Sequence, residues 1–319
     1  MGVTDADFAP TRFSTGELPV RDRLARWREE FGRALVRVDI APLTPDIPFH
    51  AEATLRALPG VGMASCSCSP AHYVRTPALA AQGDDSIGLI VNLGRKAIVS
   101  QRDHQLTLGS GDAIPVYTEE AGKLIGTRHL SIVFPRAALV SRVEALDRVV
   151  MRTIPHQTGA LRLLVNYLTL IQADGALGSP GVSQAVASHV HDLAALALGA
   201  NRDTRQNSLT AVAAARLAAA RADIAGNFTD PGLSVAAIAR RQGVSPRYLQ
   251  KLLEQSGTSF TARVNELRLN RAFVLLTGGQ SARRISEVAL QVGFTNVSHF
   301  NRLFRSRFGD TPTGIRSEQ

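Results

Sequence analysis

Polar and basic side chains are concentrated on one face of two short segments, each of which follows a glycine turn. They are Arg247, Gln250 and Lys251 in the first segment and Asn296, Ser298, His299, Arg302 and Arg305 in the second. The hydrogen-bond donors and acceptors of these residue types match base edges and phosphates in a DNA major groove. The chemistry that they predict is recognition of nucleic acid.

The elements that must position these side chains form an internal repeat. Val235, Ile238, Ala239 and Gly243 recur fifty residues later as Ile285, Val288, Ala289 and Gly293, and Leu249, Leu252 and Leu253 recur after fifty-one as Phe300, Leu303 and Phe304. An apolar stripe that ends at a turn glycine and leads into a second amphipathic helix is typical of a helix-turn-helix. The chain therefore contains two predicted copies of this motif. In the first copy, Ser245 is the expected N-cap of the second helix and Pro246 its first residue.

Residues 261–278 between the two copies predict a connecting helix. It has roughly 16 residues and is about 24 Å long at about 1.5 Å per residue. We expect it to start after Ser259 and to end at Gly278 and Gly279. A rigid helix of this length can hold two recognition helices near the ~34 Å spacing of successive major-groove segments.

Nearly all of the net charge lies in the last third of the chain. The 319 residues carry a net charge of +9. Residues 211–319 hold 15 Arg or Lys and 7 Asp or Glu, a net charge of +8, whereas residues 1–210 hold 21 and 20, a net charge of +1. A compositional bias explains Arg in place of Lys, but it does not explain this localisation. A localised positive charge is expected of a domain that replaces counterions on a phosphate backbone.

A more specific pattern runs through the second copy. Its residues are Gly293, Phe294, Ser298, Phe300, Phe304, Arg305, Phe308, Gly309, Pro312 and Arg316. With this pattern, residues 211–319 resemble the DNA-binding domain of the AraC/XylS family of bacterial transcription regulators. Ile315 departs from the family, which usually has an aromatic residue before that arginine, and we expect the change to affect packing only.

The resemblance implies a role for each polar residue of the two segments. It implies base contacts for Arg247 and Lys251, with Gln250 beside them, and for Asn296, Ser298 and Arg302. His299 and Arg305 are expected at phosphates. The resemblance further implies a sequence-specific regulator, an activator by family habit, whose partners are double-stranded DNA and RNA polymerase.

The first 200 residues have a different pattern of apolar and polar residues. Residues 19–38 predict an amphipathic helix with Leu24, Trp27, Phe31, Ala34 and Leu35 on its apolar face. Short apolar runs between turn formers over 50–135 are typical of antiparallel strands. Helices are predicted over 136–148, 158–173 and 182–199. The last two are so apolar that they either cover the sheet in the same chain or pair across a homodimer.

Residues 201–210 have the composition of an exposed linker and separate two predicted domains, 1–200 and 211–319. The expected fold class is α+β multidomain, with a β-rich N-terminal domain and flanking helices before an all-α domain with two helix-turn-helix motifs joined by a linker helix. Residues 12–35 and the turn at 108–112 make the N-terminal region similar to the cupin-like sensor domain of a subset of the family. That resemblance implies an unidentified small-molecule effector or a homodimer. Trp27, Tyr73 and Tyr117 could line the pocket, or belong to the core or surface.

Metal binding and catalysis are the alternatives for the N-terminal region. Cys66, Cys68 and His72 could offer ligands to a soft metal, but two small residues buried in a strand are the interpretation that we favour. His50, His72, His104 and His129 fall singly among the predicted strands, and the sequence has no nucleophile motif or phosphate-binding loop. We therefore expect no catalytic residue, metal or cofactor. An N-terminal domain that only dimerises, on a constitutive DNA binder, is the remaining rival.

The sequence also bears on localisation. No stretch approaches about 20 consecutive apolar residues, and the N-terminus carries acids where a signal peptide would be basic and then apolar. We expect a cytoplasmic protein that does not enter a membrane.

Overall fold

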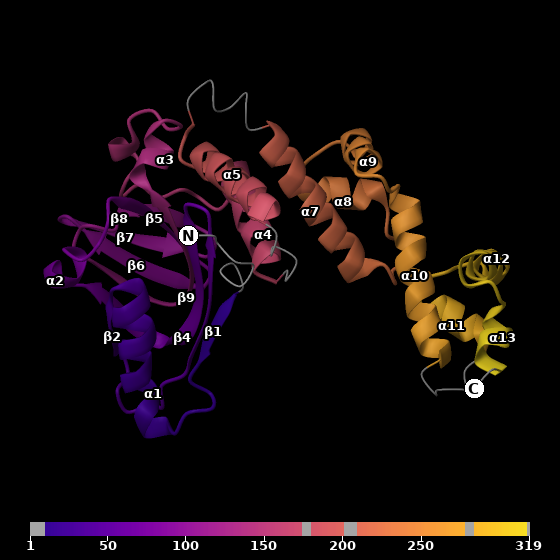
Figure 1. The fold of residues 1–319 in the computed structure, drawn as a ribbon, viewed down its shortest axis with the longest axis horizontal. Coiled ribbons are helices and arrows are strands. Elements are labelled where there is room, and N and C mark those ends of the chain that lie inside the picture. The colour runs from indigo at the N-terminus through magenta and orange to yellow at the C-terminus, as the bar shows by residue number, and fades with distance from the viewer. Residues whose placement is uncertain (1–9, 174–179, 201–208, 278–283, 318–319) are drawn as a thin grey trace. The chain divides into compact units, whose positions relative to one another are not determined.

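The computed structural model describes residues 10–173, 180–200, 209–277 and 284–317. Its contacts divide the chain into two units, Met1–Val212 and Ala213–Gln319. Strands lie in the first unit, and the described part of the second is helical (Figure 1). This arrangement confirms the predicted fold class. Of the predicted linker, 201–210, only the last two residues are described, and they begin helix α7 (Leu209–Asn227).

A bent antiparallel sheet forms the N-terminal unit. Its strands are β1 (Thr11–Ser14), β2 (Asp39–Pro42), β3 (Ala51–Leu58), β4 (Val61–Arg75), β5 (Ser86–Asn92), β6 (Lys96–Gln101), β7 (His104–Gly109), β8 (Ala113–Tyr117) and β9 (Gly122–Pro135). The long strands β4 and β9 pair with each other in two stretches, with an irregularity between Ser67 and Ala71. Each changes its outer partner along its length, β4 from β3 to β2 and β9 from β5 to β6. The sheet therefore folds over itself around an interior cavity.

The predicted helix over 19–38 is present, but its second half is wound differently. Helix α1 (Val20–Arg26) continues as a π-helix, η2 (Trp27–Val36). Trp27 and Phe31 are buried and stacked, with their ring centroids 4.3 Å apart. A π-helix bonds i to i+5, so it moves later residues off the face that α-helical spacing predicts. The prediction that Ala34 and Leu35 face the core is therefore wrong, since both are exposed.

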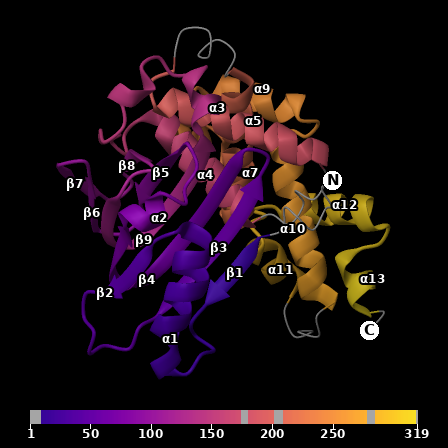
Figure 2. The same cartoon turned by 60° about the vertical axis from the view of Figure 1, so that its left-hand side comes forward.

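Two apolar helices cover the sheet within one chain. Helix α4 (Gly159–Ala173) packs against α5 (Pro180–Ala197), and α5 also contacts β3 and β4 (Figure 2). Leu161 and Leu164 of α4, and Val190 and Leu193 of α5, are at most 1 % exposed. Their burial confirms the interpretation in which these helices cover the sheet in the same chain.

The predicted helix over 136–148 is interrupted. Helix α3 (Arg136–Val140) ends early, and a 3-10 turn, η3, follows at Leu146–Arg148. Between them Ala145 has a left-handed backbone, with φ 51°. A non-glycine residue in this region cannot continue a right-handed helix, so the prediction of one continuous helix is wrong. A further short helix, α2 (Pro77–Ala80), joins β4 to β5.

Seven helices make up the described part of the C-terminal unit. They are α7, α8 (Val235–Gln242), α9 (Pro246–Gln255), α10 (Phe260–Thr277), α11 (Ile285–Gln291), α12 (Val297–Phe308) and α13 (Pro312–Ser317). Helix α10 has 18 residues, so it is about 27 Å long at about 1.5 Å per residue. The Ser259 hydroxyl accepts from the Ala262 amide at 3.2 Å, which confirms the predicted start. The predicted end at Gly278 and Gly279 lies outside the described residues.

The C-terminal unit has two separate apolar cores that share α10. The first contains Ile238, Ala239, Leu249 and Leu253 with Val264 of α10, and residues of α7 complete it. The second contains Val288, Phe294, Phe300 and Phe304 with Leu269 and Leu276 of α10, and Ile315 packs against it. Each helix-turn-helix therefore has its own core, and α10 joins the two. None of the helices in the described residues is long and apolar enough to cross a membrane.

Candidate DNA interface and ligand cavity

The two turns have the same hydrogen bonds. In the first, the Gly243 amide donates to the Arg240 carbonyl and the Val244 amide to the Ala239 carbonyl. In the second, Gly293 donates to Leu290 and Phe294 donates to Ala289. Both glycines have positive φ, 64° and 98°, a conformation that glycine adopts without steric penalty. The sequence repeat is therefore also a repeat of turn geometry.

Each turn leads directly into a capped recognition helix. The Ser245 hydroxyl accepts from the Tyr248 amide at 3.2 Å, and Pro246 is the first residue of α9, as predicted. The Asn296 side-chain oxygen accepts from the His299 amide at 2.9 Å and caps α12. Asn296 therefore has a structural role, and its side-chain NH2 group is what remains for an external acceptor.

All eight predicted contact residues lie exposed on α9 or at α12. They are Arg247, Gln250 and Lys251 on the first helix, and Asn296, Ser298, His299, Arg302 and Arg305 at the second. Leu249 and Leu253 in α9, and Phe300 and Phe304 in α12, occupy the opposite, buried face. The structure therefore gives each helix one polar, outward face.

The charges on these faces are largely free of intramolecular partners. Among the described residues, no hydrogen bond or ion pair engages the side chains of Arg247, Lys251 or Arg305. Arg302 shares a hydrogen bond with the His299 ring at 3.1 Å. Gln250 donates to Glu254 at 3.1 Å, a contact that a DNA base would have to replace.

Not every arginine of α12 faces outward in the same way. Arg307 donates to the Asn270 side chain at 3.2 Å and lies 3.5 Å from a Glu266 oxygen, both on α10. Asn301 and Ser306 instead line a shallow hollow together with Arg302 and Arg305. Asn301 and Ser306 were not among the predicted contact residues, although their helical spacing from Arg302 and Arg305 could have indicated them.

A side chain of α10 connects the two motifs. Arg268 donates to the Phe228 carbonyl at 2.6 Å and to the Asp230 carbonyl at 2.8 Å, in the loop before α8. Its guanidinium lies over the Phe294 ring, 5.7 Å from the centroid, in the second turn. Arg268 therefore ties the loop that enters the first motif to the turn of the second. Sequence reasoning could not find this residue because the contact spans about forty positions.

The N-terminal sheet encloses a cavity of about 580 Å³. Tyr73 and Tyr117 line it, whereas Trp27 is a core residue that packs on Phe31. His129, fully buried beside the Tyr73 ring, also lines it, and burial lowers the pKa of His129 to about 4. The histidine is therefore neutral near pH 7. A cavity of this size is typical of small-molecule sites.

The cysteine pair lies beside this cavity and is held by Tyr73. The Tyr73 hydroxyl lies 3.2 Å from the sulfur of Cys66 and 2.8 Å from that of Cys68. Hydrogen bonding with Cys68, together with burial, raises the pKa of Cys66. Within the described ranges, no group of three or more His, Cys, Asp or Glu residues is placed to hold a metal ion.

Comparison with known proteins agrees with this geometry. Residues 27–199 match the AraC-binding-like domain family, and residues 238–318 match a helix-turn-helix domain family. The chain is 25% identical over 320 residues to the transcriptional activator RhrA of Rhizobium meliloti (strain 1021), covering 96% of both chains. It is 29% identical over 324 residues to the transcriptional activator NphR of a Rhodococcus species, covering 95% of this chain and 92% of NphR.

A shorter match has higher identity. The HTH-type transcriptional regulator GlxA of Rhizobium meliloti (strain 1021) is 42% identical over 81 residues, which are 25% of this chain and 24% of GlxA. The N-terminal family match by itself spans more than half of the chain. The chain therefore belongs to the AraC family of transcription regulators, with an AraC-binding-like domain followed by a DNA-binding helix-turn-helix domain.

Proposed function

We propose that this regulator activates transcription by placing α9 and α12 in two successive major-groove segments of one duplex. The observation that carries the proposal is the pair of capped, outward-facing basic helices at the two ends of α10. Its length of about 27 Å is short of the ~34 Å groove spacing, and modest bending of the DNA closes the difference.

The exposed residues divide into two classes in this proposal. Arg247, Lys251 and Arg302 contact base edges, because Arg and Lys donate to guanine acceptors in the major groove. Gln250, Asn296 and Ser298 add shorter-range hydrogen bonds. His299 and Arg305 contact phosphates and contribute affinity that depends little on sequence.

The N-terminal region, residues 1–200, acts in this proposal as an effector-binding and dimerisation domain, joined to the DNA-binding domain by a linker at 201–210. Its cavity supports the effector role. Activation is supported by the names of RhrA and NphR, both transcriptional activators, and RNA polymerase is the partner that activation would require in this proposal. The chain works in the cytoplasm, where its DNA target lies, and it acts by binding rather than catalysis. An effector changes transcription only if it binds two states of the protein with different affinity.

Mapping of bound sites across the genome, followed by anisotropy titrations on one mapped site, tests the DNA-binding part. Arg247→Ala and Arg302→Ala should each cost about 1–3 kcal/mol at that site and relax base preference at distinct positions. Arg307→Ala is the matched control, because it removes the same charge from α12 but from a side chain that contacts α10. Unchanged specific binding in both alanine variants would contradict the groove assignment. If no metabolite or growth condition alters the occupancy of the mapped DNA sites, the alternative of a constitutive DNA binder with an N-terminal domain that only dimerises would be favoured.

A further inference from the structure

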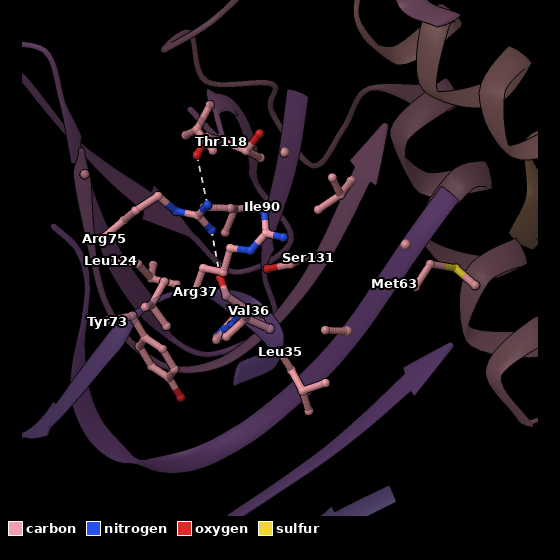
Figure 3. A pocket seen from close by; sticks show the side chains of 18 of the residues that line it. Leu35, Val36, Arg37, Met63, Tyr73, Arg75, Ile90, Thr118, Leu124 and Ser131 are labelled. Atoms are coloured by element: carbon pink, nitrogen blue, oxygen red, sulfur yellow. Dashed lines mark hydrogen bonds between the residues drawn. The ribbon is translucent and has the colours of Figure 1, made fainter. Parts of the chain in front are cut away.

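One arginine is fixed in the wall of the N-terminal cavity, and among the described residues it forms no ion pair. Arg75, at the end of β4, donates to the Thr118 and Val36 carbonyls, each at 2.9 Å (Figure 3). These bonds orient the guanidinium but do not pair its charge, because both acceptors are neutral. Burial, together with the neighbouring charge of Arg37, lowers the pKa of Arg75, and Asp84 opposes this shift.

A second arginine enters the same cavity from a strained position. Arg37 ends the η2 helix in a left-handed backbone conformation, with φ 55° and ψ 48°. Glycine is the usual residue at such a helix end, and a side chain there persists only where its surroundings compensate the strain. The Arg37 side chain lines the cavity near Arg75 (Figure 3). Among the described residues, it has no hydrogen-bond or ion-pair partner.

Acidic residues do not balance these charges. Two line the cavity: Glu120 is paired with Arg102, with one bond of 2.6 Å, and Asp84 is exposed. Two further cations, Arg56 and Lys123, belong to the lining. A half-buried cation without a counter-ion is costly, whereas guanidinium groups match the paired oxygens of a carboxylate or phosphate.

The rest of the cavity is suited to an apolar molecule. Ile90, Val99 and Leu124 line it, and Val99 and Leu124 are buried. Small-molecule sites commonly combine such apolar walls with a few polar groups that fix orientation. The cavity is therefore complementary to a ligand with an anionic group at one end and an apolar body at the other.

We propose that the cavity binds an organic anion, with its carboxylate or phosphate group held by Arg37 and Arg75 and its apolar body against Ile90, Val99 and Leu124. The proposal deepens the effector role proposed above and rests on it for its regulatory meaning. It names the class of effector, an amphipathic acid.

Titration of the full-length protein with paired probes tests this assignment. Hexanoate, decanoate, benzoate and phenylacetate are each compared with their primary amides, and hexyl phosphate with hexanol. Binding is followed by calorimetry and by the fluorescence of Trp27, the only tryptophan, which stacks on the cavity residue Phe31. We expect saturable binding of at least one acid or phosphate at millimolar concentration or below, and much weaker binding of its neutral partner. The tighter series, carboxylate or phosphate, identifies the head group.

Variants locate the binding at the two arginines. Arg37→Gln should weaken binding of the anion by about tenfold to a hundredfold without destabilising the fold, since it breaks no hydrogen bond or ion pair among the described residues. Arg75→Gln should weaken it as well. Arg128→Gln, at an exposed position of β9 outside the cavity lining, is the control and should bind normally. Equal binding of acids and amides, unchanged binding in Arg37→Gln, or no saturable binding by any anion would each overturn the proposal.

A parallel measurement of DNA binding separates this proposal from the proposed function. A neutral compound that alters binding to a mapped site, while no anion binds, would overturn the anion assignment and leave effector response intact. An anion that binds through Arg37 but never alters DNA binding or transcription would support the site and contradict effector response.

Discussion

Two glycines at equivalent turn positions provide an internally controlled test of how the DNA-binding unit is built. Gly243 and Gly293 both have positive φ. A Cβ atom at Gly243 would have no neighbour within 4 Å. A Cβ atom at Gly293 would lie 2.7 Å from the Thr229 carbonyl oxygen and 2.9 Å from Nε of Arg268. Substitution by alanine therefore adds backbone strain at both sites, but a steric clash only at Gly293.

The expected magnitudes follow from these two terms. A left-handed L-residue costs roughly 1–2 kcal/mol, and the lower entropy of the unfolded alanine chain offsets about 0.4–1 kcal/mol of this. Gly243→Ala should therefore lower the free energy of unfolding by about 1 kcal/mol. In Gly293→Ala the backbone of Thr229 must also move, at a typical overpacking cost of about 1–3 kcal/mol. Its φ of 98° is also further from the left-handed minimum. The total should be about 2–4 kcal/mol.

Hydrogen exchange followed by mass spectrometry on the full-length protein measures both effects locally. In Gly243→Ala the loss is measured at the best-protected amides of α8 and α9, and in Gly293→Ala at those of α11 and α12. The free energy of opening should fall more in Gly293→Ala than in Gly243→Ala. Equal losses in the two variants, or a larger loss in Gly243→Ala, would refute the close approach of the Thr229 loop to the second turn.

Three further predictions concern DNA affinity, pH and the junction between the motifs. Arg305→Ala should weaken binding to all DNA sequences and reduce the slope of affinity against salt by about 1, whereas Arg302→Ala should mainly reduce specificity, as measured by anisotropy over a salt series. Unfolded histidine binds a proton below about pH 6.5, but buried His129 only below about pH 4, so stability falls as the pH drops between these values. Between about pH 7.5 and 5 the N-terminal unit should lose about 2 kcal/mol more in the wild type than in His129→Phe, as measured by urea unfolding with Trp27 fluorescence; equal losses would contradict a neutral, buried His129. Arg268→Met should weaken binding to a complete site several-fold and leave binding to a single half-site unchanged, because it releases the second turn from the loop before α8. An equal loss at both sites would instead indicate damage to one motif.

The helix-turn-helix repeat could be predicted from the sequence because its determinants are local. The stripe of Val288 and Ala289, the turn at Gly293 and the cap at Ser245 each depend on residues only a few positions away along the chain, and the structure reproduces all of them. The outward placement of Arg247 and Arg302 follows from the same helical periodicity.

The cavity and the junction could not be predicted in this way, because distant segments create them. Arg75 meets the carbonyls of Val36 and Thr118, 39 and 43 positions away. The left-handed backbone of Arg37 follows a π-helix that α-helical periodicity does not reveal. The end of η2, the end of β4 and the turn after β8 bring these groups to one cavity wall.

Changing the spacing of a mapped site tests whether α9 and α12 bind one duplex together at a fixed separation. Insertion of about 5 bp, half a helical turn, between the two protected segments moves the second segment to the opposite face of the DNA. We expect the affinity of the full-length protein to fall to that of a single half-site, and insertion of a whole turn not to restore it because α10 has a fixed length. An affinity unchanged by the half-turn insertion would contradict the claim.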